Sequence, residues 1–361
     1  MKKLLAMLLA MLMVLSLAAC GGNSGNNESP NPDTNNSQQP EGPAYTEATI
    51  SVTISNGETE SAGVLAKYFF DYVTEKTGGA VKFDVYYGGT LCAPNEILDF
   101  VGGGSVDMTM SGTAQFAAEL PLVNFPSYVY GTQEEALKYA QYIAFENETT
   151  SAAIAAELAE YNLVTVGVNA GGGNAYFFKN EYASLGEATA AGLLLGCGAN
   201  LACYEALGFN TTNTMPWDCY DQLSRGVIDC TQMAIGPATS MNWNEVAPYM
   251  LVNGQYAFGN WWLINQDVWN SLNADTQAVF YEAALAAQAF SVEQYKSELT
   301  DAEAAFTAVH VMSAEDQAAE EAIFFQQSFA DCRAAAAAAG KTDAMEAILA
   351  ATNEFLGLNI Q

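Results

Sequence analysis

Histidine and cysteine, two side chains that commonly catalyse reactions or hold metals, are few in this 361-residue sequence. His310 is the only histidine, and the six cysteines beyond Cys20 show no CxxC spacing, so a zinc site of Cys and His is not expected. The sequence contains no GxSxG, HExxH or Walker motif, and one histidine in a helix-rich region does not indicate a Ser-His triad. A hydrolase that uses two carboxylates stays formally open. We expect a binding protein, with no enzyme activity, no metal and no cofactor.

The charge of the chain excludes nucleic acid as an expected partner. The sequence has 41 acidic and 11 basic residues, a net charge of −30, so the basic surface that nucleic acids require is missing. An acidic surface keeps a protein soluble without describing its ligand. Both disulfides and buried free thiols stay open for the remaining cysteines, which are Cys92, Cys197, Cys203, Cys219, Cys230 and Cys332.

One uncharged stretch, AGLLLGCGAN from Ala191 to Asn200, has almost no side-chain chemistry. It is either core filler or a binding element that lacks an expected residue. Arginine, the side chain best suited to hold a carboxylate in two hydrogen bonds, occurs only at Arg225 and Arg333. Arg225 stands at a predicted helix end that normally faces solvent, and Arg333 lies in the C-terminal helical region.

The elements that position these residues follow an α/β pattern. Residues 49–54 and 80–87 alternate apolar and polar as strands do, and the apolar residues between 64 and 73 recur at helical spacing. A helix over 94–102 and a strand over 106–110 complete a β-α-β-α-β run, typical of a parallel sheet flanked by helices. Further strands are predicted at 163–168 and 193–195, and another segment begins at 262. Helices are predicted at 200–207, 217–223, 274–300, 314–338 and 343–355.

The N-terminus reads as a secretion signal that ends in a lipid anchor. Residues 1–19 combine Lys2 and Lys3 with an apolar stretch too short to span a membrane, and Leu17 to Cys20 resembles the lipobox of bacterial lipoproteins. That resemblance implies lipidation of Cys20 and a cell-surface location, on the outer face of the cytoplasmic membrane. Residues 20–45 are rich in Asn, Ser, Gly and Pro and predict a disordered tether. Removal of the signal leaves nine basic residues against 41 acidic ones, a net charge of −32.

Five stretches, in order and at compatible spacings, together resemble the DctP-type substrate-binding proteins of TRAP transporters. They are TEKTGGAVKFDVYYGGTL (74–91), GGGSVDM (102–108), ELPLVNFP (119–126), MPWDCYDQLSRGVID (215–229) and NQDVWNSLNADTQAVF (265–280). The resemblance implies a two-lobed, periplasmic-binding-protein-like α/β fold with a hinge and long C-terminal helices. A ligand would be held in the cleft and delivered to TRAP membrane subunits. We expect lobe I over 46–168 plus about 252–290, lobe II over 169–251, C-terminal helices over 291–361, and a monomer.

The resemblance also places the uncharged stretch at the ligand. The family's anion-binding arginine closes a motif that here runs from Gly192 to Gly196, so Gly196 stands where the arginine is expected. Two positions that carry arginine in the sialic-acid-binding branch correspond approximately to Gln115 and Tyr176. Lys179 is the nearest candidate by sequence for a replacement cation, although a solvated loop lysine is the simpler interpretation.

The remaining candidate residues are amides, hydroxyls and aromatics, several of them at strand ends where open α/β sheets bind ligands. This composition suits a neutral polar ligand or a cation over an aromatic face, and not a simple dicarboxylate, sialic acid or keto acid. The alternatives are an anion held by Lys179 or by backbone NH groups, and a receptor that serves a sensor instead of a transporter. The candidate ligand-binding residues are Ser55, Asn56, Asn95, Gln115, Tyr176, Gly196, Asn200, Trp217, Gln232 and Met233.

Overall fold

The computed structural model describes residues 44–361. The predicted signal peptide, the lipidation site Cys20 and nearly all of the predicted tether lie outside the described residues. Within 44–361 no helix is both long and apolar enough to cross a membrane. The six cysteines of this part are all free thiols, and Cys197 alone among them is not fully buried.

The N-terminal part of the sheet has the predicted β-α-β-α-β order. Strand β1 (Ala48–Ile54) pairs in parallel with β2 (Val81–Tyr86) and with β3 (Met108–Gly112), and α2 (Ser61–Lys76) packs on β2. Phe69 of α2 stacks on Trp262 with ring centroids 4.1 Å apart, and both side chains are fully buried. Burial of two such rings supplies several kcal/mol, which fixes this helix on the sheet.

Two long antiparallel strands, β5 (Leu163–Phe178) and β9 (Tyr249–Asn265), connect the two parts of the sheet. The sequence predicted only the first six residues of β5, because the glycine run 171–173 interrupts its pattern. A Cβ at Gly172 would lie 2.6 Å from Cδ2 of Tyr295, so this strand passes α11 too closely for any larger residue. Several register shifts between Thr165 and Ala175 bend the pair along its length.

The second part of the sheet lies beyond β5. The strand order is β2-β1-β3-β9-β5-β8-β6-β7, and β10 (Ala308–Val311) and β4 (Tyr128–Tyr130) also pair with β9. The strands are β6 (Leu194–Cys197), β7 (Asn210–Asn213) and β8 (Cys230–Ala234). Their helices are α6 (Leu185–Ala190), α7 (Leu201–Leu207), α8 (Pro216–Arg225) and α9 (Ile235–Ser240).

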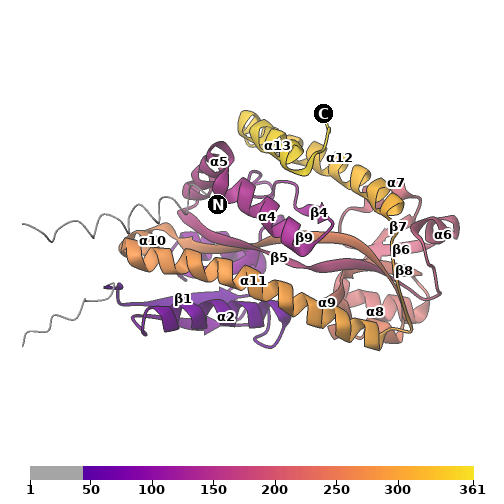
Figure 1. The fold of residues 1–361 in the computed structure, drawn as a ribbon, viewed down its shortest axis with the longest axis horizontal. Helices are drawn as coiled ribbons and strands as arrows, with labels where there is room; N and C mark the ends of the chain where they lie inside the picture. Colours follow the sequence, from indigo (N-terminus) through magenta and orange to yellow (C-terminus); the bar gives the residue numbers. More distant parts are fainter. Residues whose placement is uncertain (1–43) are drawn as a thin grey trace, which may run out of the picture. The chain divides into compact units, whose positions relative to one another are not determined.

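One 32-residue helix, α11 (Ala274–Ala305), runs beside β5, contacts α2 along much of its length and contacts α9 toward its C-terminal end (Figure 1). Asn273 caps it by accepting a hydrogen bond from the Thr276 backbone N–H at 2.9 Å. The helix therefore touches both parts of the sheet. This arrangement agrees with the predicted two-lobed α/β fold and its long C-terminal helices.

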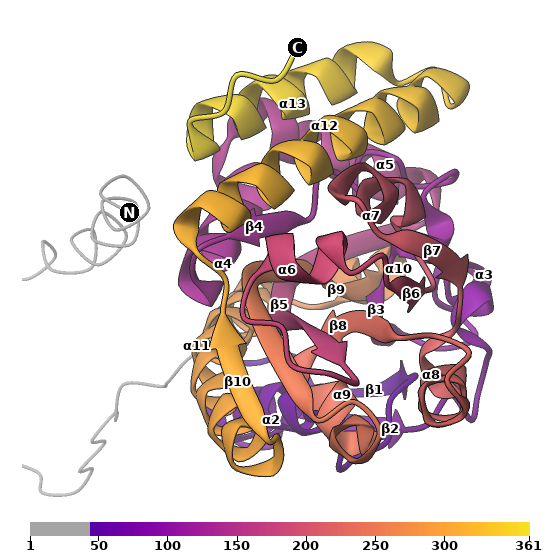
Figure 2. The same ribbon diagram turned by 90° about the vertical axis from the view of Figure 1, so that its right-hand side faces the viewer.

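The chain ends in α12 (Ala314–Ala338) and α13 (Thr342–Leu356), close to the predicted ranges 314–338 and 343–355. Figure 2 shows both helices along one side of the molecule, and α12 contacts α7 while α13 contacts α5. The other α-helices are α3 (Ile97–Gly102), α4 (Gln133–Gln141), α5 (Glu148–Glu160) and α10 (Gln266–Ser271). Short 3-10 helices are η1 (Pro94–Glu96), η2 (Ala114–Phe116) and η4 (Trp243–Glu245), and η3 (Tyr142–Glu146) is a π-helix.

Candidate functional site

Two adjoining cavities lie where the strand ends of both parts of the sheet face the connecting strands. They have volumes of about 400 and 280 Å³ and share Tyr128 and Ala257, and we call them together the central cavity. The larger one is lined by Asn174, Cys197–Asn200, Tyr204, Thr214, Pro216, Cys219, Thr231–Ala234, Trp243 and Gln255, and the smaller one by Gly112–Ala114, Val123, Asn124, Ser127, Gly171 and Phe258–Trp261.

The lining of the central cavity contains no Asp, Glu, Lys, Arg or His among the described residues. Its ionisable groups are tyrosines and thiols that stay neutral. Burial raises the pKa of the Tyr128 phenol and of the Cys197 and Cys219 thiols above their ordinary values. A ligand in the central cavity would therefore have uncharged side chains around it, although the whole chain has a net charge of −30.

Amide side chains form the polar part of this lining. Gln255, 1% exposed, accepts hydrogen bonds at Oε1 from Asn174 Nδ2 at 2.8 Å and from Gln232 Nε2 at 3.4 Å. Asn200 Nδ2 donates to the Tyr128 hydroxyl at 2.9 Å. The indole Nε1 of Trp243 is buried and has no hydrogen-bond partner within residues 44–361. Pockets of this kind, apolar with a few placed polar groups, are typical of small-molecule sites.

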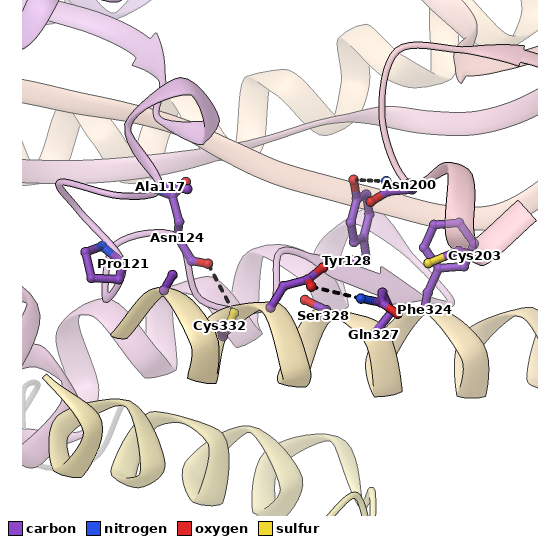
Figure 3. A pocket seen from close by; sticks show the side chains of 12 residues that line it. Ala117, Pro121, Asn124, Tyr128, Asn200, Cys203, Phe324, Gln327, Ser328 and Cys332 are labelled. Atoms are coloured by element: carbon purple, nitrogen blue, oxygen red, sulfur yellow. Dashed lines mark hydrogen bonds between the residues drawn. The ribbon is translucent and has the colours of Figure 1, made fainter. Parts of the chain in front are cut away.

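A third cavity of about 130 Å³ lies under α12 and shares Asn124, Tyr128 and Asn200 with the central cavity. Figure 3 shows the Tyr128 ring reaching toward Asn200 across this space, with Phe324 on the α12 side. The C-terminal helix α12 therefore forms part of the surroundings of the site. Nothing in the sequence pattern of α12 indicated this role.

The structure brings three of the predicted site residues, Asn200, Gln232 and Met233, into the central cavity. Trp217 lies beside the lining residue Pro216 and is 73% exposed. The other predicted residues do not line the central cavity. Ser55 and Asn56 follow the end of β1, Asn95 lies in η1, and Gln115 donates to the backbone oxygens of Pro94 and Gly112. Tyr176 is fully buried against Glu320, and Gly196 is buried in β6.

At Gly196 the space that a side chain would occupy is filled. A Cβ there would lie 2.8 Å from Ile228 Cδ1 and 2.9 Å from Thr214 Oγ1. The Gly196 carbonyl oxygen accepts a 2.7 Å hydrogen bond from the Thr231 hydroxyl, which holds β6 against β8. The strand is thus packed for glycine at this position.

The nearest candidate cations lie away from the central cavity. Lys179 follows the end of β5, and its Nζ would be 3.3 Å from a Cβ at Gly226. Arg225 forms an exposed pair with Asp221 at 3.5 Å. Arg333 makes two hydrogen bonds to the carboxylate of Glu346, at 2.7 and 3.1 Å. Both arginines of the chain are therefore engaged elsewhere.

The wall segment that carries Val123 and Asn124 is anchored by a buried carboxylate. Glu157 of α5 accepts hydrogen bonds from the backbone N–H groups of Leu122 and Val123 at 3.1 and 2.8 Å. Lys341, between α12 and α13, pairs with the same carboxylate at 3.2 Å. Burial raises the pKa of Glu157 despite these three partners, so its charge depends on all of them.

Replacing Lys341 by alanine is expected to lower the free energy of unfolding by about 2 kcal/mol, because Glu157 would keep its burial and lose its counter-ion. Urea denaturation at pH 7 measures the change. Lys296→Ala is the matched control, since Lys296 pairs with Glu293 at the surface, where solvent screens the pair and it adds little to stability. Equal effects of the two substitutions would contradict this role of Lys341.

Comparison with known proteins identifies the class to which this fold and cavity belong. The model of the family described as bacterial extracellular solute-binding protein, family 7 (DctP) matches residues 52–333. The chain belongs to this family, whose members are extracytoplasmic solute-binding proteins of TRAP transport. This confirms the resemblance seen in the sequence.

The chain is similar to relatives of known ligand class, in part of their length. A monocarboxylate 2-oxoacid-binding periplasmic protein of Nostoc sp. (strain PCC 7120) is 25% identical over 240 residues, which are 62% of this chain and 61% of that protein. The 2,3-diketo-L-gulonate-binding periplasmic protein YiaO of Escherichia coli K12 is 36% identical over 67 residues, 19% of this chain and 20% of that protein. A TRAP periplasmic solute-binding protein from Ochrobactrum anthropi has the same fold, with a TM-score of 0.71 and 19% identity over 87% of this chain and 97% of that one.

Several residues that line the cavity were not predicted from the sequence, among them Tyr128, Asn174, Trp243 and Gln255. Asn174 and Gln255 lie in the middle of the connecting strands and not at a strand end. A polar residue inside an otherwise apolar strand was the available signal, since such a side chain needs a partner when it is buried.

Proposed function

We propose that this protein captures a neutral or cationic small molecule in the central cavity and delivers it to TRAP membrane subunits. The observation that carries the proposal is the lining of that cavity, which has amides, hydroxyls and aromatic rings and no charged side chain among the described residues. A buried carboxylate ligand would need a cation or several aligned donors to replace its hydration. The two relatives are named for binding acids, a 2-oxoacid and 2,3-diketo-L-gulonate, and an uncharged cavity lining does not suit ligands of that kind.

The packing at Gly196 supports this ligand class. The family resemblance expects an arginine there, and Ile228 and Thr214 occupy the space that its side chain would need. Lys179, the alternative cation, lies past the end of β5 and not in the cavity lining. We infer that the loss of the arginine accompanies a change of ligand class and that the protein is not an enzyme.

The attachment and domain division belong to the same proposal. The lipobox-like sequence supports lipidation of Cys20, with residues 20–45 as a tether to the outer face of the membrane. Lobe I would comprise 46–168 with about 252–290, and lobe II 169–251, joined by the long strands β5 and β9. Closure of two lobes about these strands needs no second copy, which favours a monomer.

Native mass spectrometry of the protein purified without unfolding is expected to show a retained small molecule that is neutral or cationic. Gln232→Ala should lower the retained fraction, since Gln232 lines the cavity, while Gln326→Ala, exposed on α12, should leave it unchanged. Calorimetric titration with succinate should show no binding. Tight stoichiometric binding of succinate, or a retained carboxylic acid, would rule out the proposed ligand class, and turnover of the retained compound would rule out a binding protein.

A further inference from the structure

We propose that Glu320 is a positioning residue that fixes which way the cavity amides of Asn174 and Gln232 point, so that this wall selects a ligand that donates hydrogen bonds to it. The inference rests on the proposed function and names the hydrogen-bonding class of its ligand. Glu320 itself lies on α12, outside the cavity lining, and acts through Tyr130 and Gln255.

Glu320 is a fully buried carboxylate surrounded by donors. It accepts hydrogen bonds from Asn253 Nδ2 at 2.7 Å, from the Tyr130 hydroxyl at 2.9 Å and from the Tyr176 hydroxyl at 3.0 Å. An ionised carboxylate can only accept, so the hydroxyl hydrogen of each tyrosine must point toward Glu320. These donors come from β4, β5 and β9, of which β5 and β9 connect the two parts of the sheet.

The orientation of the Tyr130 hydroxyl determines the orientation of the Gln255 side-chain amide. Because the Tyr130 hydroxyl hydrogen is engaged with Glu320, its oxygen accepts from Gln255 Nε2, at 2.8 Å. The Gln255 amide is then fixed with Oε1 on its other side. There Oε1 accepts from Asn174 Nδ2 at 2.8 Å and from Gln232 Nε2 at 3.4 Å.

The consequence at the cavity is a pair of acceptor oxygens. Asn174 and Gln232 both line it, and each uses its nitrogen toward Gln255, so the carbonyl oxygens Oδ1 and Oε1 remain. Neither oxygen has a hydrogen-bond partner in residues 44–361, and neither is among the polar atoms buried without one. The buried indole N–H of Trp243, also unpartnered there, adds one donor to the same lining. A ligand with N–H or O–H groups fits this wall.

Protonation of Glu320 would remove the fixed direction. A protonated carboxyl can donate to Tyr130, which could then donate to Gln255 and reverse each amide in turn. Burial raises the pKa of Glu320 to about 7, which places this change within an accessible range. The other ionisable groups around it are Tyr130, Tyr176, and Tyr204 and Cys203 of α7, all with pKa values raised by burial, and Asp316 on its own helix.

The test compares two neutral five-membered rings, pyrrole as a donor and tetrahydrofuran as an acceptor, by NMR titration of the whole protein. At pH 8.5 the wild type is expected to bind pyrrole about tenfold more tightly than tetrahydrofuran. At pH 5.5 the ratio should fall toward one. Tyr130→Phe interrupts the chain of hydrogen bonds and should give a ratio near one at both pH values.

The matched control is Tyr139→Phe, which keeps the ring and removes a buried tyrosine hydroxyl that is 2.8 Å from Thr352 Oγ1; Tyr139 itself is not among the residues that line the central cavity. It should keep both the wild-type ratio and its pH dependence. A wild-type ratio that does not change with pH, a Tyr130→Phe protein with the wild-type ratio, or no binding of either ring would overturn the inference. The wild-type pH profile needs no variant, so the test stands even where Tyr130→Phe fails to fold. A retained carboxylic acid together with an intact pyrrole preference would overturn the proposed function alone.

Discussion

Replacing Glu320 by alanine is expected to lower the free energy of unfolding at pH 8 by about 4 kcal/mol. The substitution removes the acceptor of three buried donors, on Tyr130, Tyr176 and Asn253, and leaves a cavity in the packing of α12. A buried donor without an acceptor lowers the free energy of unfolding by more than a formed hydrogen bond raises it. The expected destabilisation therefore exceeds that of an average core truncation. Urea denaturation followed by circular dichroism measures it.

The same residue gives the stability a pH dependence of predictable sign. The folded-state pKa of about 7 lies above the ordinary 4.5, so the folded protein holds a proton that the unfolded chain releases between these values. The contribution of Glu320 to stability therefore falls as the pH rises from about 4.5 to 7, by ~3 kcal/mol over the full window.

Glu320→Gln isolates this dependence, because it keeps the shape and most hydrogen bonds and cannot titrate. Its free energy of unfolding should change less between pH 5 and pH 8 than that of the wild type. Glu354→Gln, at an exposed position of α13, should leave the wild-type profile unaltered. A Glu320→Gln protein with the wild-type pH profile would show that the carboxyl does not titrate as described.

A Gly196→Arg variant is expected to lose about 3 kcal/mol of folding free energy and to gain no affinity for succinate. The arginine would begin with a Cβ 2.8 Å from Ile228 and would bring a guanidinium into a buried strand without a prepared partner. Restoring the family residue thus tests whether the pocket around it has also been rebuilt. Thermal denaturation and succinate titration of the same preparation give both answers.

Two alanine variants separate packing from charge at this strand. Gly196→Ala should already cost about 1–2 kcal/mol, because its Cβ meets Ile228 and Thr214. Gly198→Ala should be nearly neutral in stability, since its Cβ would make ordinary contacts of 3.6 Å with Met215 Sδ and the Thr214 carbonyl oxygen. A stable Gly196→Arg protein that binds succinate would mean that the space at Gly196 opens readily.

The sequence predicted the elements that carry one clear periodicity. β2 and α2 have one more buried and one more exposed side, β1 alternates apolar and polar residues, and their observed bounds lie within a few residues of those expected. Most of β5 and β9 was not predicted, because both of their sides are largely buried and glycines interrupt them, which removes the alternation that marks a strand. Their length follows from pairing with each other, a contact between segments far apart in the sequence.

Site residues could be predicted where a polar residue stands beside a recognisable helix or strand motif. Asn200 opens α7 and Gln232 lies in β8 after a recognisable motif, and both line the central cavity. Tyr176 illustrates what the sequence lacked. Its hydroxyl is bound to Glu320, 144 residues away, and nothing local indicates that an acidic residue of a C-terminal helix would be buried beside it.

The protein surface is acidic and the central cavity is uncharged, so charge affects how fast a ligand arrives more than how long it stays bound. A net charge of −30 attracts cations and repels anions over about one Debye length, ~8 Å at physiological salt. Inside the central cavity no described side chain carries a charge on which salt could act. Ionic strength should therefore change the association rate constant of a cationic solute, while its dissociation rate constant stays nearly the same.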